Sequence, residues 1–178
     1  MAATVEVIRL TGAGPSVSTI TGLNTRANAE DAHSLAGTTN PIQIPAAGSN
    51  YSYWVTTRLL ITAAPAGTIN NVGWYTDGTN GFGTGVTCLG NSSASYVQAT
   101  GTPGTTGTQL NQTNHAGLSA SVTNVFTFTV AGALSVSASQ SGGTGQLGNY
   151  VVYQMVIGTT AGPGATAAET FTFRFDET

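Results

Sequence analysis

The sequence predicts an all-β protein, an antiparallel β-sandwich of the jelly-roll type with about eight strands and little or no helix. Segments of strand length, rich in apolar and β-branched residues, recur along the chain and are separated by Gly, Pro, Ser and Asn turn signals. The 178 residues include 24 glycines, and only 6% of residues are charged. No segment has the apolar spacing of a long helix. These three observations favour strands joined by long Gly/Ser/Thr loops.

The N-terminal third contains two short predicted strands. Residues 4–10 are β-branched and end at a Gly/Pro break in residues 12–15, after which residues 16–21 form a second strand. Residues 24–35 are the most polar stretch and are expected to form an exposed loop with one turn of helix. Residues 40–45 begin and end with Asn-Pro and Ile-Pro pairs, which predicts an extended backbone.

The middle of the chain contains the longest strand signal, in residues 51–62, where aromatic and β-branched residues are concentrated. A strand at residues 68–76 follows a Pro/Gly turn. Beyond it apolar residues are sparse, and only residues 86–89 and 95–98 have the character of strands. Residues 101–107 are predicted to form a flexible low-complexity loop.

The C-terminal third contains the clearest patterns. Residues 121–130 alternate apolar and polar side chains, which predicts a strand, and residues 133–138 follow as a weaker one. Residues 150–158 are continuously apolar, as in a strand buried on both sides. Residues 170–175 alternate Phe with Thr and Arg, which is typical of a strand with one wet face. We expect the last two segments to form a closing β-hairpin whose aromatic face fills the sandwich.

This pattern suggests two parts of unequal size. Residues 1–15 are predicted to form an N-terminal strand or arm, and residues 16–178 a single β-sandwich domain closed by the hairpin at residues 150–175. An arm could add to the sheet edge of another chain and so contact a neighbouring subunit. The alternative is an ordinary edge strand of its own sandwich. The residues expected to make the contact are Val5, Val7, Ile8, Arg9 and Leu10.

Titratable side chains are too few and too scattered to predict catalysis. Glu30 with Asp31 and Asp176 with Glu177 are adjacent pairs, and adjacent carboxylates in a strand point to opposite faces. His33 and His115 lack the spacing of a zinc motif, and the single Cys88 is expected to be a buried, inert thiol. We therefore predict a protein that is not an enzyme, with no catalytic, cofactor-binding or metal-binding residues.

Composition also bears on partners and location. The chain has no lysine, no phosphate-binding motif and no basic patch, which disfavours nucleic acid as a partner. No run approaches the roughly 18 apolar residues that a membrane-spanning helix needs. The N-terminus lacks the pattern of a signal peptide, so we expect synthesis in a cytoplasm. A surface with so few charges suits a protein that works in an assembly or outside a cell.

Four aromatic residues have two interpretations. Trp54, Trp74, Tyr75 and Tyr96 could form an exposed stacking platform for sugars, as in a carbohydrate-binding module. They could instead fill the core or a subunit interface, which is the interpretation we favour. No motif in the sequence decides between the two.

The C-terminal sequence resembles the ending of a known family. Residues 150–158 (YVVYQMVIG), residues 160–164 (TAGPG) and residues 169–177 (ETFTFRFDE) are similar to the ends of small β-sandwich structural proteins of tailed bacteriophages, most of all capsid decoration (cement) proteins. The charge-poor composition, rich in Gly, Thr, Ser and Ala, fits the same family.

The resemblance implies a virion protein on the capsid exterior, made in the host cytoplasm. It further implies a homotrimer seated on local threefold sites, where it binds the major capsid protein and braces the shell. Tail and fibre proteins share this composition, so membership of the virion is implied more strongly than a position on the head. The alternative function is a carbohydrate-binding β-sandwich module that serves surface or tail adhesion.

Overall fold

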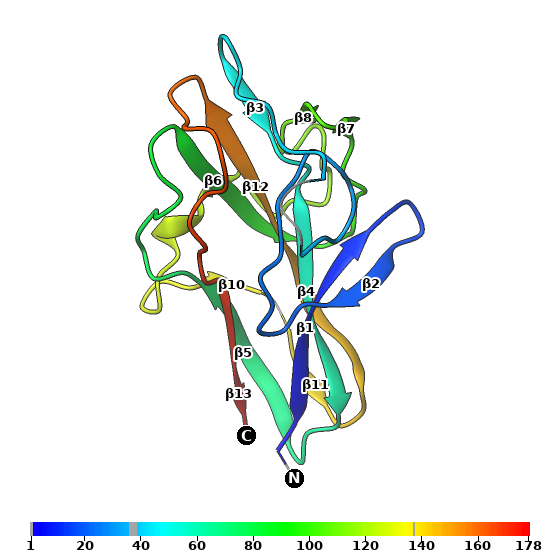
Figure 1. Ribbon diagram of the computed structural model, residues 1–178. Helices are drawn as coiled ribbons and strands as arrows, with labels where there is room; N and C mark the ends of the chain where they lie inside the picture. The colour runs from blue at the N-terminus through cyan, green and yellow to red at the C-terminus, as the bar shows by residue number, and fades with distance from the viewer. Residues whose placement is uncertain (1, 36–38, 137) are drawn as a thin grey trace.

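The protein is an antiparallel two-sheet β-sandwich, seen in a computed structural model that describes residues 2–35, 39–136 and 138–178 (Figure 1). The larger sheet has the strand order β2 (Ser16–Thr19), β1 (Thr4–Thr11), β4 (Val55–Ala63), β12 (Gly145–Gly158), β6 (Val86–Ser93) and β9 (Thr123–Asn124), with β3 (Ser49–Tyr51) also paired to β12. In the smaller sheet β5 (Thr68–Tyr75) pairs with β10 (Leu134–Ser135), β11 (Gln140–Ser141) and β13 (Thr172–Glu177). A separate hairpin joins β7 (Gly101–Thr102) and β8 (Thr106–Gly107).

Strand β12 is the centre of the larger sheet and is buried on both faces, as its continuous apolar run predicts. It pairs with β4 along one edge and with β6 along the other. Val151 and Tyr153 face the smaller sheet, whereas Val152 lies in a second core cluster on the opposite face. Because a strand covered on both sides has no wet face, its sequence does not alternate.

The first core cluster fills the space between the two sheets. Its buried members come from β4, β5, β6 and β12 and include Trp74 and Cys88. The period-two pattern of the C-terminal strand is confirmed, because Phe173 and Phe175 are half-buried against this cluster while Arg174 is exposed.

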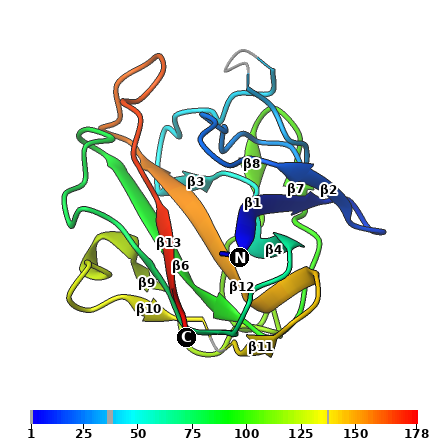
Figure 2. The same ribbon diagram turned by 90° about the horizontal axis from the view of Figure 1, so that it is seen from below.

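The prediction that residues 150–175 form a β-hairpin is wrong. Strand β12 belongs to the larger sheet, whereas β13 pairs with β5 in the smaller one, so the chain between them crosses from sheet to sheet (Figures 1 and 2). The physical reason is that β4 and β6 already occupy the two edges of β12. Strand β13 satisfies its backbone groups with β5 instead.

Of the two interpretations of residues 1–15, the structure agrees with a strand of the chain's own sandwich, although β1 lies inside the larger sheet, between β2 and β4, and not at its edge. Strand β1 pairs with β4 along its length, and Ile8–Thr11 also pair with β2. Arg9 is 1% exposed, and its guanidinium donates hydrogen bonds to the Thr25 hydroxyl and the Arg26 carbonyl. Ile8 and Leu10 are buried on the opposite face, so these residues are not free to join another chain.

Three further predicted elements, at residues 121–130, 95–98 and 24–35, differ from the structure. The strand expected at residues 121–130 is reduced to β9, followed by a 3-10 helix, η1 (Val125–Thr127), whose consecutive residues Val125 and Phe126 both point into the core. The Asn124 side chain caps η1 by accepting the Phe126 amide, and this local bond competes with strand pairing. Residues 95–98 form no strand, and residues 24–35 contain no helical turn.

The loop expected at residues 101–107 is instead the ordered β7–β8 hairpin. Thr105 and Gly104 tie it to the rest of the chain by accepting hydrogen bonds from the backbone and side chain of Gln43. Residue 137, inside the strand predicted at 133–138, lies outside the described residues, and β10 accounts for two of the others.

Candidate functional site

Neither tryptophan is exposed, as a sugar-stacking platform would require, so the less favoured of the two interpretations does not apply to them. Trp74 is 1% exposed in the first core cluster and Trp54 is 3% exposed in the second, so the two rings lie on opposite faces of the larger sheet. The Trp54 indole donates to the Val97 carbonyl, as a buried indole N–H normally requires a partner. Tyr75 is half-buried, with the Arg174 guanidinium 6.0 Å from its ring centre. The core interpretation therefore holds for both tryptophans.

The outer face of the larger sheet is closed by residues 94–122, which we call the covering segment. Ala99, Leu110 and Leu118 of this segment pack with Trp54 and Val152 in the second cluster. Three hydrogen bonds fasten the segment to β6: the Asn91 side chain donates to the Ser121 carbonyl, the Ser119 amide donates to the Ser92 carbonyl, and the Ser92 hydroxyl donates to the Ser119 hydroxyl. The covering segment contains no Asp, Glu, Lys or Arg, so His115 is its one side chain that a moderate fall in pH could charge.

Gln154 connects this segment to the centre of the sheet. It is 1% exposed and lies in the otherwise apolar run of β12. Its side-chain oxygen accepts the Leu110 amide at 2.7 Å. Its side-chain nitrogen donates to the carbonyls of Ser52 at 2.6 Å and Thr108 at 2.8 Å. One buried amide therefore satisfies three backbone groups from two different segments.

His115 is the buried titratable group of the covering segment. Its side chain is 0% exposed, and neither ring nitrogen has a hydrogen-bond partner among the described residues. The ring packs edge-on against Trp54, with 5.5 Å between centroids and 64° between planes. Burial lowers the pKa of His115, so the imidazole is neutral in the closed structure at neutral pH.

The carboxylates serve separate loops and do not converge on one site. The Asp31 carboxylate accepts the Gly12 amide, Glu169 accepts the Gly81 amide, and Glu177 accepts the amides of Ala3 and Ala66. Within residues 2–35, 39–136 and 138–178, His, Cys, Asp and Glu form no group of three that could hold a metal ion.

Cys88 is buried as predicted, and desolvation raises its pKa, which keeps the sulfur a thiol.

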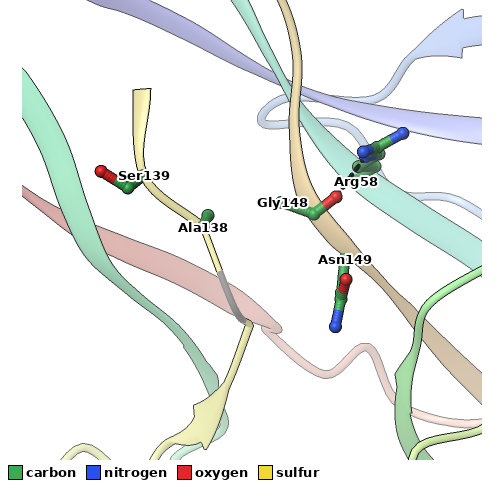
Figure 3. Close-up of a pocket in the computed structure, with 5 residues that line it drawn as sticks. All are labelled: Arg58, Ala138, Ser139, Gly148 and Asn149. Carbon is green, nitrogen blue, oxygen red and sulfur yellow. Dashed lines mark hydrogen bonds between the residues drawn. The ribbon is translucent and has the colours of Figure 1, made fainter. Parts of the chain in front are cut away.

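A shallow hollow of about 490 Å³ lies where β12 bulges away from β4 (Figure 3). Arg58, Ser139 and Asn149 are its polar lining residues. The Arg58 guanidinium is held by the Gly148 carbonyl at 2.6 Å and stacks 4.5 Å above the Tyr150 ring centre. A fixed guanidinium beside an aromatic ring and two polar side chains can bind a small polar group.

The end of the molecule opposite the two termini is built from uncharged loops (Figure 1). Residues 44–49, 78–85, 101–107 and 158–168 contain no charged side chain. Two of these loops contact each other, since the Gly158 amide donates to the Gly85 carbonyl at 2.7 Å. At Gly85, with φ of 74°, an added Cβ would collide with residues 160 and 161, so the close approach requires glycine.

Comparison with known proteins does not place this sandwich in a family. No family matches the sequence, and neither the curated proteins nor the solved structures contain a match. In the described part of the chain, no helix is long and apolar enough to cross a membrane.

Proposed function

We propose that the protein is a non-enzymatic virion structural protein that decorates and stabilises a phage capsid through oligomeric and shell contacts. The observation that carries the proposal is a two-sheet body that bears, at the end opposite the termini, loops rich in Gly, Thr and Ala that have no charged side chain of their own. The resemblance of the C-terminal sequence to decoration proteins supports the same function. Contacts made by such loops depend on shape and backbone hydrogen bonding, so the binding should be insensitive to salt.

Two unpaired strand edges support an oligomeric state. Among the described residues, β2 pairs only with β1, and β13 pairs only with β5, so each of these two strands leaves one of its own edges open. An open edge carries free N–H and C=O groups that a neighbouring chain can pair with. Val17 on β2 is 48% exposed and adds an apolar side chain to this edge. In the proposed assembly these edges contribute to a homotrimer.

The test compares particles made with and without the protein. We expect the protein in purified particles, and we expect particles that lack it to release their genome at a lower temperature or lower chelator concentration. Adding the purified protein back should restore resistance, and light scattering should give the mass of a trimer in solution or on the shell. Absence from the particles together with unchanged stability would contradict the proposal.

A carbohydrate-binding module is the second candidate, and the hollow beside Arg58 is the observation that favours it. Because Trp54 and Trp74 are buried, a sugar in this hollow would bind through its polar lining residues Arg58, Ser139 and Asn149. A glycan array separates the two functions. The decoration protein should bind no glycan, whereas a module should bind one and lose that binding in the Asn149→Ala variant.

A further inference from the structure

The covering segment is held closed by apolar contacts and uncharged hydrogen bonds alone. The second core cluster beneath it contains six buried residues, compared with sixteen in the first cluster. Hydrogen bonds to β6, Trp54, Gln154 and Gln43 fasten the segment, and a region with a small buried cluster opens more readily than the body of a protein. His115 lies within this closed region, where its ring contacts Trp54.

A charge on His115 would be compensated in the closed structure by its own backbone alone, and burial outweighs that effect. Both ring nitrogens are buried and unpartnered. The other titratable or charged groups around the second cluster are Tyr53, Tyr96, Tyr150 and Arg58. Asp31 and Arg9 act on Tyr96 in opposite directions, but no charged side chain shifts the pKa of His115. An imidazolium at this position is therefore desolvated and unpaired, which is strongly unfavourable.

We propose that His115 is an acid-sensitive latch, whose protonation releases the covering segment and exposes the second core cluster while the two-sheet body stays folded. The direction of the pH dependence follows from proton linkage, because a histidine whose pKa is lowered in the closed state binds its proton mainly in the open state. The closed state is fully stable above the ordinary histidine pKa of about 6.5 and loses stability as the pH falls below it. Trp54 and Val152 are the apolar side chains that opening would uncover.

Hydrogen exchange of the intact protein, followed by mass spectrometry, tests the latch. After correction for intrinsic exchange rates, the opening constant of peptides from residues 94–122 should rise about 30-fold between pH 8 and pH 5, given an open-state pKa of about 6.5. Peptides from β12 should keep their protection. The His115→Gln variant should lose the pH response, and the control variant His33→Gln should retain it.

Two results would overturn the latch. One is an opening constant in the wild type that changes less than about threefold over this range, and the other is an equal rise in His115→Gln. If His115→Gln does not fold, the imidazole of the wild type can be titrated by NMR. A ring that titrates at about 6.5 while the covering segment remains protected would equally refute the latch, because protonation would then leave the segment closed.

Discussion

Replacing Gln154 by Leu should destabilise the protein by about 3–5 kcal/mol, although the two side chains are similar in size. The change leaves the Leu110 amide and the carbonyls of Ser52 and Thr108 without their partner. Each buried, unsatisfied backbone group costs about 1–3 kcal/mol. Urea denaturation followed by circular dichroism measures the loss as a lower midpoint.

Gln146 provides the matched control on the same strand. It is exposed, and its side-chain oxygen accepts a hydrogen bond from Arg58 alone. Gln146→Leu should therefore change the unfolding free energy by less than about 0.5 kcal/mol. Equal losses in the two variants would show that the buried amide has no special role.

Gln154→Glu should add a dependence on pH. A carboxylate can accept the Leu110 amide but cannot donate to the two carbonyls. Burial raises the pKa of the introduced carboxyl in the folded state, so stability relative to wild type falls as the pH rises above the ordinary glutamate value. If the Gln154→Glu variant loses the same unfolding free energy relative to wild type at pH 5 and at pH 8, this reasoning is contradicted.

Truncating Trp74 to Ala should cost about 3–5 kcal/mol, the second large effect expected in this protein. The ring is 1% exposed and stacks on Tyr153 at 6.1 Å between centroids. It also meets Phe128 and Phe171 edge-on, at 6.3 Å and 5.1 Å. Removing it leaves a cavity where the two sheets pack, and thermal unfolding should occur at a lower temperature.

Trp74→Phe and Tyr75→Ala serve as controls for this cavity. The first keeps an aromatic ring against Tyr153 and Phe171 and should lose less than the alanine variant. The second removes a half-buried neighbour on the same strand and should also cost less. If Tyr75→Ala were the more damaging change, the face assigned to the core on β5 would be incorrect.

The sequence predicts the long strands and the faces they bury, because these depend on local patterns, whereas the assignments of residues 95–98, 101–107 and 121–130 are wrong. Alternating Phe residues place one face of β13 against the core, and the unbroken apolar run of β12 requires cover on both faces. One polar residue within that run, Gln154, is the local signal for a buried hydrogen-bonding centre. The burial of Cys88 is predicted by the apolar residues around it.

Only the tertiary structure decides which strands pair and what covers the outer face of the larger sheet. The partner of β13 is β5, and the partners of β12 are β4 and β6, because these edges are brought together by contacts remote in sequence. The covering segment has few apolar residues, so its closure depends on single contacts such as that of Leu110 with Gln154. The burial of His115 follows from that closure. A local sequence pattern predicts which face of a strand a side chain lies on, but it does not predict the distant groups that bury it.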